Sequence, residues 1–236
     1  MSRSATFIFV VCAWLAPLVG TAAPTESTVY ITLTSDYVKR GVTQTDGDPA
    51  IQAGGDIRFS NGFFAGAWAS TIDISNGPNR QRDTEVDVYA GYTFDANDKW
   101  QFTAHTVLYT YPGQTGNVDY DYQEIAISSN YDDRLWIEYA YAPDLYNSNN
   151  SAQNIDVYAE WPLKGRWSLG IGVGRYDTSN LNDSSYTYWQ LGLTRNFDWA
   201  DLDIRYHDAS TWVPIISTKD TAEARIAITL QIPFSF

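Results

Sequence analysis

The last sixteen residues of the chain, 221–236, carry the pattern that most restricts its fold. They read TAEARIAITLQIPFSF, with an apolar residue at every even-numbered position and mostly polar residues between them. Because successive side chains of a β-strand point to opposite faces, this period of two predicts one long strand with an apolar face and a polar face. The predicted strand is well beyond the ~5–6 residues typical of strands in globular proteins.

The same alternation recurs in eleven earlier segments, and the connections between consecutive segments are alternately long and short. An even number of strands, with tight turns at one end and longer loops at the other, is typical of bacterial outer-membrane barrels. The sequence therefore predicts an all-β protein, a transmembrane antiparallel up-and-down β-barrel of about twelve strands. Both termini would lie on the short-turn, periplasmic side. The eleven segments are 27–37, 49–59, 63–71, 84–94, 99–109, 121–131, 134–142, 154–163, 167–176, 185–197 and 201–207.

A soluble β-sandwich or a lipocalin-like barrel would show the same period, with its apolar face turned inward. Two features of the segments favour the membrane barrel. The glycines of segment 167–176 leave its polar face nearly empty, as a lumen can be, and tryptophans lie beside the short turns at Trp100, Trp161 and Trp167. Aromatic girdles of this kind mark the membrane interfaces of such barrels.

The first 22 residues resemble a secretory signal peptide, with Arg3 before an apolar core at 5–19 and small residues at 20–23. Cleavage after Ala22 is favoured, because a cut after Ala23 would leave Pro24 as the first residue. The alternative, an uncleaved anchor, has too short an apolar stretch for the ~20 residues that a span needs. We expect residues 23–236 to form one barrel domain in the outer membrane of a Gram-negative bacterium, in contact with its lipid.

The chain ends in Phe236. Outer-membrane barrels commonly end in a phenylalanine that the barrel-assembly machinery reads. By this resemblance, we expect Phe236 to be the assembly signal.

Composition excludes several classes of function. Removing Arg3 takes the formal net charge from −13 to −14, which argues against nucleic acid as a partner. The chain has two histidines, His105 and His207, and no Gly-x-Ser-x-Gly sequence. A hydrolase needs a nucleophile beside a base, and the two histidines lack the close spacing that favours a metal. We therefore expect no enzyme activity, no cofactor and no metal.

The polar faces of the segments carry ten acids and three bases. Such an excess of carboxylates in a lumen raises the local concentration of cations. This predicts passive diffusion of small, cationic or neutral solutes. The acids are Asp56, Glu85, Asp87, Glu124, Glu138, Asp156, Glu160, Asp201, Asp203 and Glu223, the bases are Arg58, Arg205 and Arg225, and His105 is on the same face.

The same residues allow a second interpretation. The bases would pair with neighbouring acids, Trp136, Tyr158 and Tyr188 would fill the interior, and the barrel would be closed. Such a protein would act as a surface binding or structural protein through its six long outer loops. The pattern indicates neither the solute nor the oligomeric state.

Residues 35–52, SDYVKRGVTQTDGDPAIQ, closely resemble the opening motif of the TorF-type porins. This proteobacterial family of exported proteins is also known as a domain of unknown function of Gcw_chp type. Further segments agree with it: NGFFAGAWAS at 61–70, EVDVYAGYTF at 85–94, YTYPG at 109–113 and YAPDL at 141–145. The resemblance covers essentially the whole mature chain, implies a porin role and brings no catalytic residues.

The opening motif places several polar residues at the outer end of the first hairpin. One hypothesis is that Arg40 folds inward and pairs with Asp36 or with a lumenal carboxylate, because a cation at a constriction tunes passage. The alternative is that Arg40-Gly41 and Asp46-Gly47 only shape and brace a loop. The motif residues singled out are Ser35, Asp36, Tyr37, Arg40, Gly41, Gln44 and Pro49.

Overall fold

The computed structural model describes residues 24–73, 83–112, 119–213, 217 and 219–235. The predicted signal peptide and Phe236 lie outside these residues. Within them, twelve long antiparallel strands close into one barrel, so the predicted fold class is confirmed. The strands are β1 (Pro24–Thr34), β4 (Ala50–Phe59), β5 (Phe63–Ile72), β6 (Asp83–Asp95), β7 (Trp100–Thr110), β8 (Tyr122–Tyr131), β9 (Leu135–Ala142), β10 (Ala152–Pro162), β11 (Trp167–Asp177), β12 (Ser185–Asn196), β13 (Asp201–Ala209) and β14 (Arg225–Ser235).

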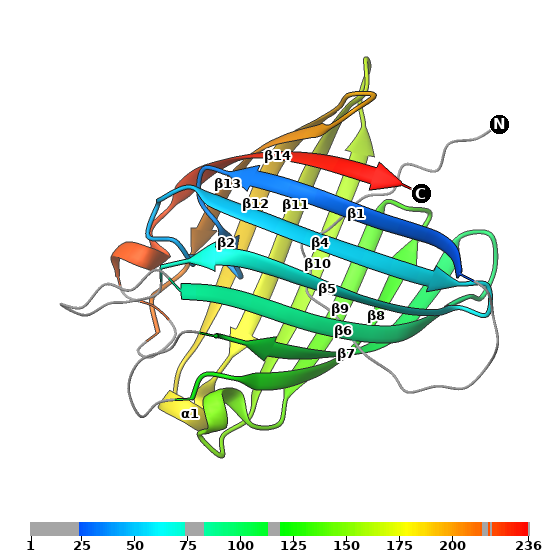
Figure 1. Cartoon of the computed structure of the whole chain (residues 1–236). Coiled ribbons are helices and arrows are strands. Elements are labelled where there is room, and N and C mark those ends of the chain that lie inside the picture. The colour runs from blue at the N-terminus through cyan, green and yellow to red at the C-terminus, as the bar shows by residue number, and fades with distance from the viewer. Residues whose placement is uncertain (1–23, 74–82, 113–118, 214–216, 218, 236) are drawn as a thin grey trace.

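Each long strand pairs with its sequence neighbours, and the barrel closes where β1 pairs with β14, seen as blue beside red in Figure 1. The predicted bounds of the first eleven strands lie within three residues of those observed. The start of the last strand was predicted wrongly, because a short helix, η2 (Asp220–Ala222), precedes it. Ala222 is buried in the interior instead of continuing the outward alternation.

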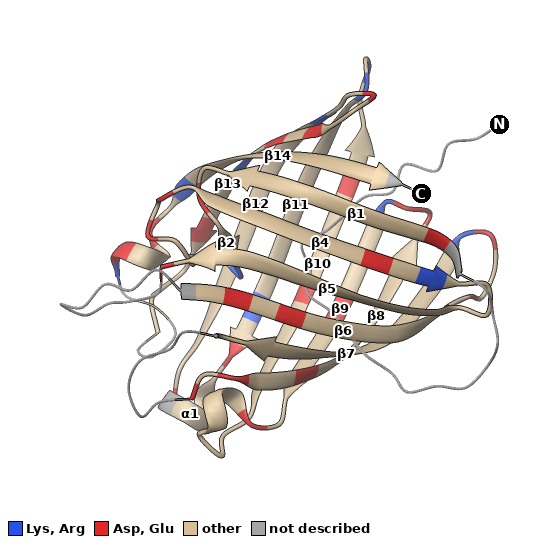
Figure 2. Ribbon diagram, viewed as in Figure 1, with Lys and Arg blue, Asp and Glu red and all other residues tan. Residues whose placement is uncertain are grey.

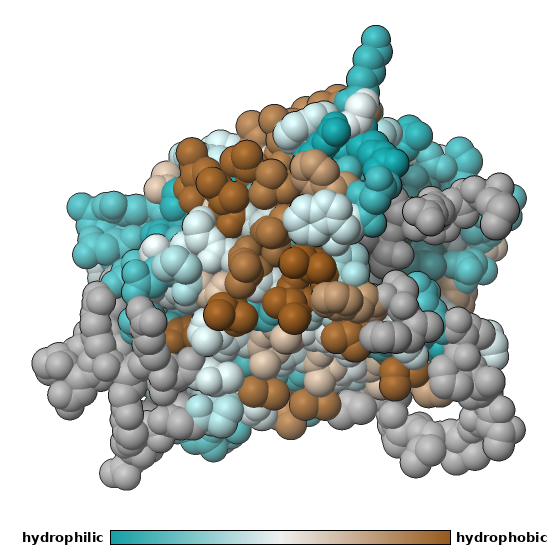
Figure 3. Space-filling model, turned by 45° about the horizontal axis from the view of Figure 1, so that its top comes forward, coloured by the Kyte–Doolittle hydropathy of each residue, from teal (hydrophilic) through white to brown (hydrophobic). Residues whose placement is uncertain are grey.

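The barrel wall turns its apolar side chains outward. On β1, Val29, Ile31 and Leu33 are each more than 40% exposed, whereas Tyr30 and Thr32 between them are buried. In Figure 3, apolar residues gather across the middle of the visible wall, with hydrophilic residues toward both ends. A soluble sandwich or lipocalin-like barrel would present the reverse arrangement, so the membrane-type orientation holds. No helix in the described ranges is long and apolar enough to cross a membrane.

Tyrosines lie over the glycines on the inner face of the wall. Tyr158 on β10 faces Gly172 on β11 and also covers Gly170, and Tyr188 on β12 covers Gly174. The predicted empty face on β11 is therefore wrong, because each glycine makes room for a ring from the neighbouring strand. With no side chain beneath it, the ring lies against the wall.

The long connections carry the remaining elements at one end of the barrel. They are β2 (Val38–Lys39), β3 (Val42–Thr43), η1 (Leu145–Asn147), α1 (Ser179–Asn182) and η2. Tyr146 within η1 is partly buried and packs against the interior tyrosines, and the loss of solvent around its hydroxyl raises the pKa of that group to about 12. This end of the interior is packed with tyrosines, of which Tyr109 and Tyr122 stack with ring centroids 4.4 Å apart.

Candidate functional site

The first long connection folds back as a small hairpin, formed by the pairing of β2 with β3. Its two central residues, Arg40 and Gly41, have φ values of +50° and +78°. Positive φ at both positions is the signature of the tight turn whose twist matches paired strands. A Cβ on Gly41 would lie 2.6 Å from Cβ of Tyr188, so the turn packs directly against the barrel wall.

Arg40 at the tip of the hairpin forms a two-pronged ion pair with Glu124 on β8. Nη1 and Nη2 donate to the two carboxylate oxygens at 2.7 and 2.8 Å. Both side chains are largely buried, and the guanidinium lies 4.6 Å from the ring centroid of Tyr176. Paired donors on a carboxylate fix orientation as well as charge. Of the two partners expected for Arg40, the structure thus pairs it with the lumenal carboxylate.

Lys39 forms a second ion pair, with Glu85 on β6. Its Nζ lies 2.9 Å from Oε1 of Glu85 and 3.7 Å from the ring centroid of Tyr109. The hydroxyl of Tyr109 in turn donates to Glu124 at 3.2 Å, which links the two ion pairs. Buried charges persist only where such pairing and hydrogen bonding satisfy them.

Asp36 at the base of the hairpin forms the third ion pair, with Arg225 on β14 at 2.9 Å. Its other oxygen accepts hydrogen bonds from the hydroxyls of Thr43 and Thr45. The three wall residues come from β6 and β8, which are separated by β7, and from β14, while Gly41 at the tip packs against Tyr188 on β12. The hairpin therefore lies across the interior and is fixed on several sides.

The other motif residues brace this arrangement. The Ser35 hydroxyl accepts a hydrogen bond from the backbone of Ile228, and the ring of Tyr37 packs edge-on against Trp68. Gln44 donates to the carbonyl of Val42, while Pro49 is exposed just before β4. Both hypotheses thus describe part of the geometry. The motif braces the loop, and it also brings Lys39 and Arg40 inside the barrel.

Most of the predicted polar-face residues meet close partners. Arg205 pairs with Asp203 at 2.8 Å and donates to the hydroxyl of Tyr158 at 3.1 Å. Asp56 accepts from Tyr89, Asp156 from Tyr188, Glu160 from Tyr158 and Asp201 from Asn196, and His105 lies 3.2 Å from Glu138. Asp87 is fully buried, whereas Arg58 is exposed at the end of β4 and lies over the ring of Phe64.

Two corrections change the charge of this face. Glu223 is exposed and ends the short helix η2, so it does not belong to the wall. Lys39 and Arg40 reach the interior from a loop, which a count of strand residues alone leaves out. Asp36, which pairs with Arg225, reaches the interior from the same loop. Ten acids then stand against five bases among the described residues, so the carboxylate excess is smaller than predicted but keeps its sign.

The fold is similar to solved porin structures. It matches the KdgM porin with a TM-score of 0.55 at 11% identity, over 88% of this chain and 99% of that one. It matches the KdgM porin in complex with disordered oligogalacturonate with a TM-score of 0.55 at 12% identity, over 88% and 99% of the two chains. For the NanC porin, the TM-score is 0.56 at 13% identity, over 87% and 98%.

At these identities, the likeness establishes a porin-like barrel fold. No curated protein sequence matches this chain significantly. A family model does match it, over residues 19–234, which is nearly its whole length. The chain belongs to the family described as "Bacterial protein of unknown function (Gcw_chp)".

Proposed function

We propose that this protein is an outer-membrane porin of the TorF type that lets small cationic or neutral solutes diffuse passively. The observation that carries the proposal is a closed barrel with an apolar outer wall and an interior in which acids outnumber bases. Fixed carboxylates in a confined space favour cations and disfavour polyanions. The mechanism needs no energy input, cofactor or catalytic residue.

The β2–β3 hairpin sets the narrowest part of the proposed pathway. It lies across the interior and brings two cations to meet two wall carboxylates. Because these charges neutralise each other, the selective field comes from the remaining carboxylates of the wall. Oligogalacturonate, present in one similar structure, is a polyanion. An excess of carboxylates disfavours such a polyanion, so we propose that this chain passes cationic or neutral solutes instead.

Single-channel recording in a planar bilayer under a salt gradient tests the proposal. We expect discrete conductance steps with a reversal potential that shows preference for cations. Anion-selective steps would contradict the charge assignment of the lumen while keeping the porin. Absence of steps from protein shown to be folded and inserted would contradict the porin and identify a closed barrel, whose function would reside in its outer loops.

The proposed placement has residues 1–22 removed on export and residues 23–236 forming the barrel, assembled from the periplasm through the last strand. Replacing Phe236 by Ser should lower the yield of folded protein in the outer membrane, because the assembly machinery would lose its terminal aromatic. Quantifying the heat-modifiable band in membrane fractions measures this. Phe234→Ser, two residues earlier on the outward face of β14, is the matched control for loss of an aromatic side chain. Equal yields for the Phe236 variant and the unaltered chain would refute the role.

A further inference from the structure

The outer wall carries a group of bases and aromatic rings at its short-turn end, on β10, β11 and β12. This basic–aromatic patch consists of Lys164, Arg166, Arg195, Trp161, Trp167 and Phe197. Lys164 and Arg166 lie in the turn between β10 and β11, and Figure 2 shows blue residues at the tip of that turn. Trp161 and Phe197 are each at least 40% exposed on the wall.

Arg195 is at the centre of the patch. It continues the outward face of β12, on which Leu191 and Leu193 are exposed. Its guanidinium carbon lies 5.4 Å from the ring centroid of Trp167 and 5.5 Å from that of Phe197. None of the ion pairs in the described part of the chain includes Arg195.

The turn next to Arg195 brings further positive charge. The backbone N–H of Asn196 donates to the carbonyl of Arg166 at 3.0 Å, which fixes the turn against the end of β12. A Cβ on Gly165 would lie 3.5 Å from Nη1 of Arg195, so the guanidinium lies over the turn. Arg166 pairs with Asp198 at 2.6 Å, and Lys164 is exposed. The patch therefore keeps a net positive charge.

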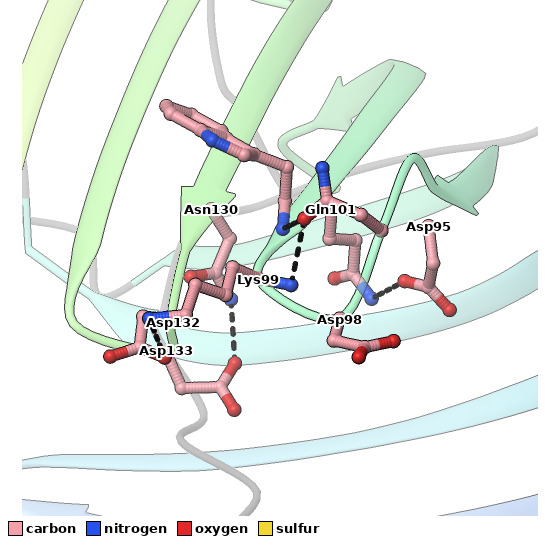
Figure 4. Close-up of a pocket in the computed structure, with 9 residues that line it drawn as sticks. Asp95, Asp98, Lys99, Gln101, Asn130, Asp132 and Asp133 are labelled. Atoms are coloured by element: carbon pink, nitrogen blue, oxygen red, sulfur yellow. Dashed lines mark hydrogen bonds and ion pairs between the residues drawn. The ribbon is translucent and has the colours of Figure 1, made fainter.

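The two preceding short turns of the same end, β6–β7 and β8–β9, are acidic. A polar hollow of about 450 Å³ lies at these turns, and Asp95, Asp98, Asp132 and Asp133 line it together with Lys99 (Figure 4). These carboxylates are partly satisfied within the hollow, for example by Gln101 on Asp95 and by Asn130 on Asp133. These two turns hold four carboxylates against Lys99 and Arg134, whereas the patch holds three bases against Asp198. The net positive charge thus lies at the patch, although the protein as a whole is acidic.

We propose that the basic–aromatic patch binds the headgroup phosphate of an anionic phospholipid, with Arg195 as its main contact. A guanidinium offers paired N–H donors that match phosphate oxygens. Aromatic residues at the end of a barrel wall mark the level of the lipid headgroups, so Arg195 lies at the depth of a phosphate. Basic side chains near an anionic membrane surface add attraction. The inference rests on the proposed membrane placement.

Native mass spectrometry of the detergent-purified protein tests the site. Dioleoyl phosphatidylglycerol is titrated into the unaltered protein and into Arg195→Gln, with dioleoyl phosphatidylcholine as the neutral lipid. We expect the unaltered protein to prefer phosphatidylglycerol. The Arg195→Gln variant should bind it about fivefold more weakly, the factor that one base near an anionic surface contributes.

Two matched controls locate the effect. Arg175 lies on β11 near the opposite end of the wall and donates to the hydroxyl of Ser185, and Lys99 lines the acidic hollow. Arg175→Gln and Lys99→Gln should bind the lipid like the unaltered protein. Equal binding by the Arg195 variant, equal loss in either control, or displacement of the lipid by inorganic phosphate alone would overturn the proposal.

Failure of this inference can be told apart from failure of the porin proposal. Arg195 lies on the outer wall, so Arg195→Gln should keep the conductance and selectivity of the unaltered channel. Weaker lipid binding with unchanged conductance supports the patch whatever the solute is. Channel activity together with no preference for phosphatidylglycerol would refute the patch and leave the porin standing.

Discussion

Replacing Glu124 by Gln is expected to release the β2–β3 hairpin and to increase the single-channel conductance strongly. The change keeps the shape of the side chain but leaves the Arg40 guanidinium buried without a counter-charge. Breaking a buried ion pair by removing one partner costs about 3–5 kcal/mol. Since 1.4 kcal/mol is a factor of ten, the ratio of released to docked hairpin should rise by at least about a hundredfold.

A double-mutant cycle shows whether the pair itself is responsible. Arg40→Gln together with Glu124→Gln removes both charges and should cost much less than the sum of the single changes. Glu138→Gln, another interior carboxylate change on β9, is the control for a general loss of negative charge. Conductance that rises equally in Glu124→Gln and Glu138→Gln would argue against a hairpin held by Arg40.

Replacing Gly66 by Val is expected to block barrel folding or to destabilise the barrel severely. Gly66 on β5 pairs with Tyr89 on β6, whose ring covers it and whose hydroxyl donates to Asp56 at 2.6 Å. A Cβ at this position would lie 2.6 Å from the backbone carbonyl oxygen of Gly55 and against the tyrosine ring. The backbone cannot move aside as a flexible side chain can. The loss in the free energy of unfolding should therefore reach or exceed the cost of ordinary overpacking, about 1–3 kcal/mol.

The matched control is Ala67→Val, one residue further along β5, where the side chain points outward and is exposed. Its extra methyl groups would face the surroundings, and valine suits a strand. Urea unfolding in detergent, followed by tryptophan fluorescence, compares the two variants. Similar midpoints for both would show that the ring over Gly66 moves freely and that the tight contact has no energetic weight.

The strands could be predicted from the sequence because each face of the wall restricts which residue types can occupy it. Outward residues such as Ile226 and Ile228 must be apolar and inward ones such as Gln231 are polar, so the alternation is nearly unbroken. The alternation predicted the wrong structure at the start of the last strand, where a short helix precedes it. Ala222 fits the outward phase by its chemistry, but η2 turns it into the interior.

The site depended on information that a strand pattern does not contain. Arg40 and Glu124 are 84 residues apart, and their contact requires both the closed barrel and the inward fold of one loop. The resemblance of residues 35–52 to a family motif was the one signal that pointed to this loop. Lys39 was part of that motif, but nothing in its spacing indicated a partner. The rings over the β11 glycines needed the register between neighbouring strands.

The order of the ion-pair partners along the chain has a consequence for biogenesis. The hairpin belongs to the first loop, yet its three partners lie on β6, β8 and β14, and the last of them, Arg225, begins the final strand. A chain that stops before that strand can neither close the barrel nor anchor Asp36. The hairpin can therefore form all three of its ion pairs only after the last strand has been made. The constriction reaches its final structure only in a complete barrel.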